Sequence, residues 1–557
     1  MADTQFRVLY RQFLFRVVDL EILSSEGEAS RLLGQFAALL VFSGLVFSIG
    51  IWSMADARIS TSQHQLARRG FEHFLIATTM LVVGLFAVLC WDSILPDQRD
   101  VLVLAPLPIR ASTIFLAKVS AVATGLAVTV AALNALSCLP APLAFAPLNC
   151  GLLGLPQSFV AYWIAMFAAG TFIFCCVLGV QATAGLVLPR QPFLRLSSFL
   201  QIGAFCLFVC LYFLEPSLAA ANHYWLTYSP SYWFLGLFDQ LNGSMQPAFA
   251  PLAIRAWLGL AVAGVTVAVL YPLSYFRMLF RIAEQPDVVP HFVRLNWLPP
   301  LGGALKTAVG HFSIRTLLRS RKHRLILAFY WGLGFALTIL FVKMLPPQQE
   351  TGMAATINMW RRPNTELLVA SAMMLFSVVL GTRIAFAMPI DLPANWSYRI
   401  TPLAGLPEYM AATRRAMLLL AVAPVWMGWA TIFLWLWGWG RGWGELLVFA
   451  LLGVITAEIT LAGFHKIPFT CSYLPGKSKI NITFWLCIGF LGLIVDQGAI
   501  LELHALQRPV SYAAMIALLL VATILARKRT ALVAASESLR FEELPAPAVL
   551  HLGLHHD

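Results

Sequence analysis

Long apolar runs recur along the whole chain, and they constrain its fold more than any other feature. Each run is near the ~20 residues that a helix needs to cross a hydrocarbon core about 30 Å thick. Because the runs are continuous and do not alternate between apolar and polar residues, they favour helices over the strands of a barrel. With 59% hydrophobic and 11% charged residues, the chain carries more apolar side chains than a water-soluble surface can hide. We therefore predict an all-α polytopic membrane protein.

About twelve runs are expected to span the membrane, as two sets of six. The first set lies near 33–54, 73–94, 113–138, 158–185, 196–214 and 253–275, and the second near 325–345, 364–387, 416–438, 446–465, 482–501 and 510–526. A long basic stretch, from about 276 to 324, separates them. The expected domains are a first six-helix half over 1–280, a second over 281–529, and a flexible cytoplasmic tail over 530–557.

The placement of the basic residues explains the net charge of +12 without nucleic acid. Arginine and lysine gather before the first run, in the central stretch and in every second loop after it, and the opposite loops hold fewer. Cytoplasmic loops carry such an excess of positive charge. We expect a multi-pass protein of a bacterial-type inner membrane with both termini in the cytoplasm.

Each half is expected to begin with an amphipathic helix along the membrane face. Residues 5–20 place apolar side chains at helical spacing, and residues 305–316 form a comparable stripe that precedes a cationic cluster. A simple basic anchor to anionic lipid is the alternative for each helix. Their recurrence in both halves favours a role shared by the two repeats.

Two cytoplasmic loops combine short length with exposed apolar residues. The first runs from Asp97 to Arg110 and reads VLVLAPLPIR at its end, and the second contains Asp391, Trp396 and Arg399. Apolar residues outside the membrane are expected to be covered. Either a partner protein covers them, or they fold back on the helix bundle.

The sequence shows no recognisable motif for catalysis. The sequence CSYLPGKS, Cys471 to Ser478, ends like a nucleotide-binding loop, but a cysteine replaces its first glycine and it joins two membrane runs. The spacing of metal ligands and a loop large enough for a catalytic domain are both missing from the sequence. We expect a protein that is not an enzyme, with no catalytic or metal-binding residues and no cofactor of its own.

Polar residues inside the runs are candidates for function, because they are costly at membrane depth. The candidates are Asn134, Glu458 and Asp496. For Glu458 three roles are open: an ion pair across the bundle, a substrate path, or proton transfer. Asp496 also fits a position near the outer interface.

The loop DVLVLAPLPIRASTIFLAK, Asp100 to Lys118, resembles the loop between the second and third spans of type-2 ATP-binding-cassette permeases. That family also has spans in sixes, an amphipathic interface helix before the first span, and a short outer element between the fifth and sixth, matched here by residues 5–20 and 229–243. The resemblance covers most of the first half. The second half departs further, since Asn395 and Trp396 stand where the first loop has leucine and proline.

The resemblance implies two fused half-permeases whose loops dock on a separate nucleotide-binding ATPase subunit, present in two copies. ATP would then be bound by the partner, and the exported substrate would be hydrophobic or amphipathic. The residues implied in coupling are Asp100, Leu104, Pro106, Pro108, Ile109 and Arg110 in the first loop, and Asp391, Asn395, Trp396 and Arg399 in the second.

An ion-coupled secondary transporter is the main alternative, because two sets of six helices also describe the major facilitator architecture. That family carries a polar Gly-Asp-Arg-rich loop after the second span, whereas apolar residues and prolines occupy Asp97 to Arg110. A membrane-bound lipid-modifying enzyme is disfavoured, because no polar loop holds paired carboxylates.

Overall fold

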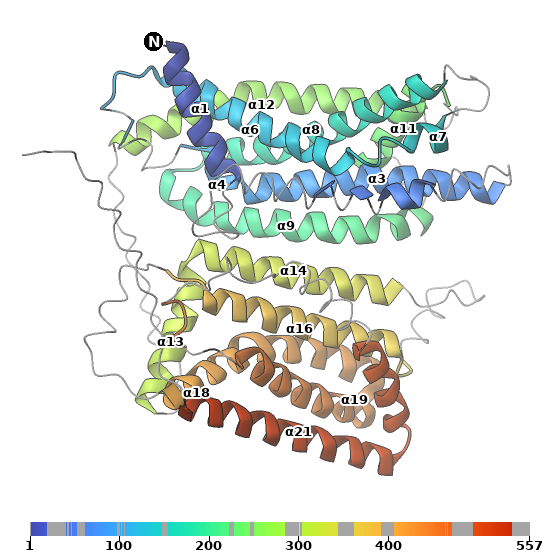
Figure 1. Ribbon diagram of the computed structural model, residues 1–557, viewed down its shortest axis with the longest axis vertical. Helices are drawn as coiled ribbons and strands as arrows, with labels where there is room; N and C mark the ends of the chain where they lie inside the picture. Colours follow the sequence, from blue (N-terminus) through green and yellow to red (C-terminus); the bar gives the residue numbers. More distant parts are fainter. Residues whose placement is uncertain are drawn as a thin grey trace, which may run out of the picture. The chain divides into compact units, whose positions relative to one another are not determined.

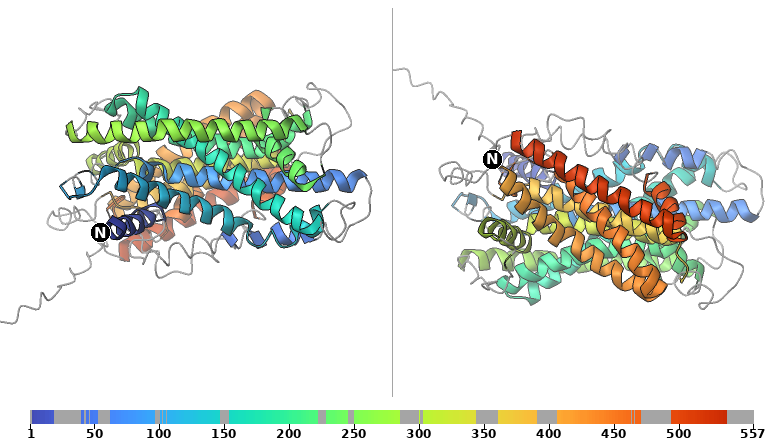
Figure 2. Two further views of the ribbon diagram at one scale, coloured as in Figure 1. Left: turned by 90° about the horizontal axis from the view of Figure 1, so that it is seen from above. Right: turned by 90° about the horizontal axis from the view of Figure 1, so that it is seen from below.

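The structure, a computed structural model, is helical in all the regular elements that it describes (Figure 1, with two further views in Figure 2). It describes residues 2–536 except for 19–39, 42–43, 46, 53–61, 97–100, 102, 105, 147–153, 222–227, 245–249, 285–299, 301–302, 344–360, 391–405, 463, 465 and 471–493. The chain divides into two compact units, Met1–Phe292 and Val293–Asp557, called unit 1 and unit 2. The division falls in the basic stretch between the two expected halves.

Unit 1 is a bundle in which α8 holds the central place, in contact with α3, α6, α9, α11 and α12. Small residues let these helices approach closely, as is usual in membranes. At Gly170 of α8, for example, an added Cβ would lie 2.8 Å from Val130 of α6. In chain order the helices are α1 (Ala2–Val18), α3 (Ser62–Leu89), α4 (Trp91–Ile94), α6 (Ala111–Asn134), α7 (Ala141–Phe145), α8 (Gly154–Val187), α9 (Arg190–Ala221), α11 (Pro230–Asn242) and α12 (Ala250–Glu284).

Unit 2 is organised around α16, most of whose residues are buried. Tyr330 of α14 lies directly over Gly381 of α16, where a larger residue has no room. The helices are α13 (Ala304–Arg319), α14 (Arg321–Lys343), α16 (Thr365–Ala387), α18 (Leu406–Met417), the π-helical turn η4 (Leu418–Val422), α19 (Ala423–Leu461), a helix over 494–506, and α21 (Pro509–Ser536).

The long helix α19 is a hairpin of two helices that reverses at Gly438. A straight helix of 39 residues would be about 58 Å long, twice the thickness of a hydrocarbon core. Gly438 instead has φ 73° and ψ 179°, and the two arms pack on each other. Trp426 Nε1 donates to the carbonyl of Leu446 at 2.9 Å. The arms correspond to the expected spans 416–438 and 446–465.

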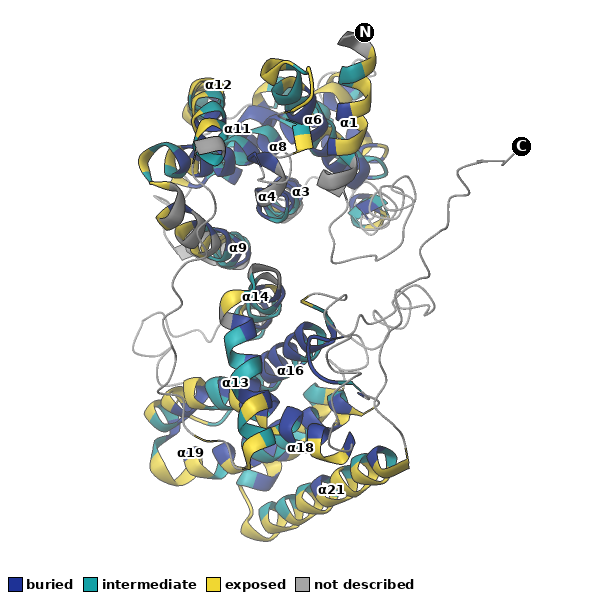
Figure 3. Cartoon of the chain, turned by 90° about the vertical axis from the view of Figure 1, so that its left-hand side faces the viewer, coloured by how far each residue is buried: buried dark blue, intermediate teal, exposed yellow. Residues whose placement is uncertain are grey.

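Seven helical stretches among the described residues are long and apolar enough to cross a membrane: Arg68–Leu89, Ala111–Asn134, Gly154–Val187, Ala250–Ile282, Thr365–Ala387, Leu406–Leu461 and Pro509–Ser536. Figure 3 shows exposed residues along α12 and α21, and many of them are large and apolar. On α21, for instance, Val510 is 82% and Leu518 67% exposed, which suits contact with lipid tails. The chain is therefore an all-α, multi-pass membrane protein.

The count of twelve spans stays a prediction. The expected fifth and seventh spans fall in α9 and α14, whose apolar portions, Phe199–Tyr212 and Ile326–Ile339, are shorter. The expected first and eleventh spans lie partly outside the described residues. What is described of the first packs on unit 1, since the rings of Phe47 and Phe74 of α3 are 5.5 Å apart.

Substituting Gly438 by alanine is expected to destabilise the hairpin by about 1–3 kcal/mol, because its backbone conformation is open to glycine alone. No other atom lies within 4 Å of a Cβ built at Gly438 or at Gly440, and Gly440 lacks the positive φ. Gly440→Ala is therefore the matched control. Thermal unfolding in detergent should show a lower Tm for Gly438→Ala only, and equal Tm values for the two variants would contradict the hairpin.

Candidate functional site

The loop between α4 and α6 sorts its side chains into two sets. Leu104 and Ile109 are half-buried and pack on the apolar cluster of α1 and α6. Two backbone bonds shape the turn between them, from Leu107 N to Leu104 O at 3.2 Å and from Ile109 N to Leu107 O at 2.7 Å. The side chains that face outward are those of Val103, Pro106, Leu107, Pro108 and Arg110. The loop thus both folds back on the bundle and leaves an apolar surface open, while Asp100 lies outside the described residues.

Helix α1, the expected interface helix, packs along the beginning of α6. Leu9 and Phe13 are buried in one cluster with Ala117 and Ala121 of α6. The Tyr10 hydroxyl shares a hydrogen bond of 3.0 Å with Thr124. On the opposite face of α1, Arg7, Arg11 and Gln12 are exposed, and so is Val8. The apolar side chains of the amphipathic pattern therefore attach α1 to the bundle.

Just before this loop, α3 and α4 end inside the protein, where the last carbonyls of a helix lack partners of their own. Other helices supply donors to these carbonyls, an arrangement that we call the carbonyl collar. Val88 accepts from Gln201 of α9 (2.6 Å), Trp91 from Gln181 of α8 (2.6 Å), Ile94 from Tyr271 of α12 (2.7 Å) and Leu95 from Lys118 of α6 (2.6 Å). The base of the loop is thereby tied to four helices at once.

Unit 2 repeats two of these features with different residues. Helix α13 packs on α18, with Val309 buried beside Tyr409 and Ala412, as α1 packs on α6. The end of α16 is again supplied with donors: Lys466 Nζ donates to Ala387 O at 3.1 Å, and the amide of Phe469 to Phe386 O at 2.9 Å. The four expected coupling residues of the second loop, Asp391, Asn395, Trp396 and Arg399, lie outside the described residues.

Asn134 belongs to a buried hydrogen-bond network at the opposite end of α6. Its Nδ2 donates to Thr79 of α3 at 3.3 Å, and its Oδ1 accepts from the Tyr162 hydroxyl of α8 at 2.7 Å. Ser137 completes the network through Tyr162 at 2.8 Å. The polar groups of the network are hydrogen-bonded to one another, so the network joins three spans. All of its side chains are neutral.

Glu458 is an ion-pair centre in unit 2. It is 2% exposed and lies 3.1 Å from Arg414 Nη1 of α18 and 3.5 Å from Arg527 Nε of α21. Thr530 of α21 donates to its other oxygen at 3.1 Å. Three helices therefore meet at this carboxylate, which is the geometry of a structural pair.

A pair of acidic residues that was not predicted from the sequence lies at the other end of unit 2 from Glu458. Glu445 of the hairpin and Glu502 of the helix over 494–506 are 1% and 6% exposed and interact directly through their carboxyl groups. The Tyr512 hydroxyl bonds beside them to Gly444 O at 2.8 Å. Two acidic side chains from different helices are thus brought together inside unit 2. Asp496, the expected candidate on the same helix, is only half-buried.

The far end of unit 1 holds α11, the expected short element between the fifth and sixth spans. His73 of α3 bonds Ser231 at 2.7 Å and stacks on Tyr232 with ring centroids 4.0 Å apart. Asn242 donates to Phe145 O at 2.7 Å. Burial raises the pKa of the Asp239 carboxyl, and the positive charges of Arg69 and Arg68 partly offset this rise. These contacts fasten α11 to α3 and α7.

No group of three His, Cys, Asp or Glu side chains that would hold a metal ion lies within the described part of the chain. No known family model matches this chain, and neither does any curated protein or solved structure. The functional assignment therefore depends on the residues themselves.

Replacing Tyr271 by phenylalanine is expected to cost about 1–2 kcal/mol of stability, because it leaves the Ile94 carbonyl without its donor. Amides of residues 103–110 should then exchange with solvent faster. Tyr212→Phe is the matched control, since its partner Thr78 keeps a bond to Phe74 O at 2.7 Å. Unchanged exchange in the loop of Tyr271→Phe, measured by mass spectrometry, would show that the collar does not hold the loop.

Proposed function

We propose that this chain is the membrane-spanning permease subunit of an ABC-type exporter, and that a separate ATPase subunit, in two copies, supplies the energy. The single observation that carries the proposal is the two-sided loop over 101–110. Its inner residues Leu104 and Ile109 are anchored, while Val103 and Leu107 are 66% and 47% exposed. An exposed apolar surface on a firmly held base is what a docking element requires.

The carbonyl collar supports a coupling role for this loop. A force on the loop acts on the ends of α3 and α4, whose carbonyls are bonded to side chains of α6, α8, α9 and α12. Helix α1 lies against the same loop and the same end of α6. Movement of the docked ATPase would therefore shift several spans together, as alternating access or lateral extrusion demands.

The proposed topology places both loops and both termini in the cytoplasm of a bacterial-type cell. It rests on the excess of arginine and lysine in every second loop. The substrate is proposed to be hydrophobic or amphipathic, because the described spans carry few charges. The chain itself is proposed to catalyse no reaction.

A second candidate function, an ion-coupled secondary transporter, is favoured by one observation. Glu445 and Glu502 form a buried carboxyl pair on two helices, and such a pair can take up and release a proton. The sequence alone offered few carboxylates for this role. The two candidates differ in whether transport needs ATP or a proton gradient.

Reversing the charge of Arg110 is expected to lower the amount of soluble ATPase that co-purifies with the tagged chain several-fold, because Arg110 is exposed at the docking surface. Leu107→Glu should do the same by removing an apolar contact. Arg441→Glu is the control, since Arg441 is equally an exposed arginine and lies at the turn of the α19 hairpin. Quantitative mass spectrometry of the purified complex measures the effect, and a wild-type chain that brings down no ATPase would refute the proposal.

The double variant Glu445→Gln, Glu502→Gln separates the two candidates. In vesicles with an imposed proton gradient and no ATP, a secondary transporter would export a fluorescent amphipathic dye, and the double variant would not. Glu408→Gln, an exposed residue of α18, is the control. For the ABC-type permease we expect no export without ATP and its ATPase, and unchanged ATP-driven export by the double variant.

A further inference from the structure

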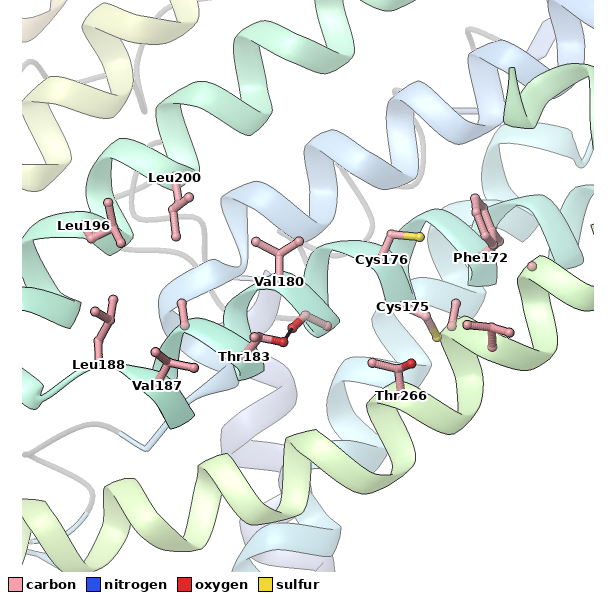
Figure 4. A pocket seen from close by; sticks show the side chains of 15 residues that line it. Phe172, Cys175, Cys176, Val180, Thr183, Val187, Leu188, Leu196, Leu200 and Thr266 are labelled. Atoms are coloured by element: carbon pink, nitrogen blue, oxygen red, sulfur yellow. Dashed lines mark hydrogen bonds between the residues drawn. The ribbon is translucent and has the colours of Figure 1, made fainter. Parts of the chain in front are cut away.

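A lateral groove in unit 1 is lined by α8, α9 and α12 and has a volume of about 780 Å³, within the range of ligand sites. Figure 4 shows its floor along α8, from Phe172 to Val187, with Leu196 and Leu200 of α9 on one side and Thr266 of α12 on the other. Phe172 and Val187 are fifteen residues apart, or about 22 Å along the helix. That is longer than one leaflet of hydrocarbon, which is about 15 Å.

The groove is apolar along this length. The few polar groups include the Thr183 hydroxyl, which already donates to Gly179 O at 2.7 Å, so it does not need a polar partner. Cys175, Cys176 and Val180 continue the apolar wall. The surface thus suits a hydrocarbon chain and offers little to a polar ligand.

One end of the groove is positively charged. Arg281 of α12 donates from Nη1 to the carbonyl of Leu188, a lining residue, at 2.9 Å. This bond holds the guanidinium of Arg281 beside this end of the groove. Arg277 lies one turn earlier on α12 and is exposed. Both follow lining residues, Gly259 and Ala263, by eighteen positions, or five full turns, and so lie on the same side of the continuous α12.

The described residues of the segment over 40–52 do not cover this groove. Its described residues pack elsewhere, since a Cβ at Gly44 would meet the Leu133 carbonyl of α6 and one at Gly50 the ring of Phe71 of α3. The apolar lining of the groove matches the hydrocarbon of a lipid tail. The cationic end selects the charge of what fills it.

We propose that this groove binds one anionic phospholipid, with an acyl chain along α8 between α9 and α12 and the phosphate at Arg277 and Arg281. The carbonyl of Leu188 holds the Arg281 guanidinium at the end of the groove, and a guanidinium carries five N–H donors, of which a phosphate can accept two side by side. The site stands whether the chain is an ATP-driven or an ion-coupled transporter.

The test uses the full chain in nanodiscs of phosphatidylglycerol and phosphatidylcholine in equal parts, followed by native mass spectrometry of retained lipid. The wild type should keep one phosphatidylglycerol. Ala263→Phe fills the groove, and Ala268→Phe places the same bulk on an exposed position of α12 outside it. We expect Ala263→Phe to lose the lipid and Ala268→Phe to keep it.

Arg277→Gln with Arg281→Gln should lower phosphatidylglycerol occupancy about tenfold, as loss of a charge-assisted contact predicts. Val262→Trp, at a lining residue that is 65% exposed, is a second groove-filling variant should Ala263→Phe fail to fold. The proposal is overturned if the wild type retains no lipid or retains both lipids equally. It is also overturned if the groove-filling variant that folds keeps its phosphatidylglycerol, because the lipid then lies elsewhere.

Discussion

Backbone carbonyls at buried helix ends are the constraint on which both units depend. A helix that stops within the protein leaves its last carbonyls without donors, and in a medium of low polarity each costs several kcal/mol. In unit 1, side chains of four helices converge on the end of α3 and α4. Their reach fixes where α6, α8, α9 and α12 stand around that end. The position of the following loop is a consequence of this arrangement.

Unit 2 meets the same requirement with a different set of donors. At the end of α16 the donors are Lys466, the amide of Phe469 and His323, whose ring lies 3.0 Å from Met388 O. These residues come from other positions than their counterparts in unit 1. What the two units share is the packing of a short helix on a longer one, α1 on α6 and α13 on α18, and donors at the ends of α4 and α16.

Hydropathy predicted the seven described stretches that are long and apolar enough to cross a membrane, because the length of such a run is set by the thickness of a bilayer. The runs 416–438 and 446–465 were predicted as separate spans, and the structure has its hairpin between them. The interface helices followed from helical spacing. The two faces of the first loop did not follow, because Leu104 and Leu107 are the same residue type and only the partner in α1 distinguishes them.

The pair of Glu445 and Glu502 was not predicted from the sequence, for a related reason. Both residues lie near the ends of apolar runs, where a glutamate is ordinarily in water and has no cost of burial. No spacing in the sequence connects the two residues. Only the reversal at Gly438 brings Glu445 to the helix over 494–506. Glu458, by contrast, lies inside a run, where an unpaired charge has a high free-energy cost and therefore needs partners. The same cost made Glu458 a candidate in the sequence. A functional carboxylate can thus be predicted from the sequence where it lies inside an apolar run. It is missed where only the tertiary structure buries it.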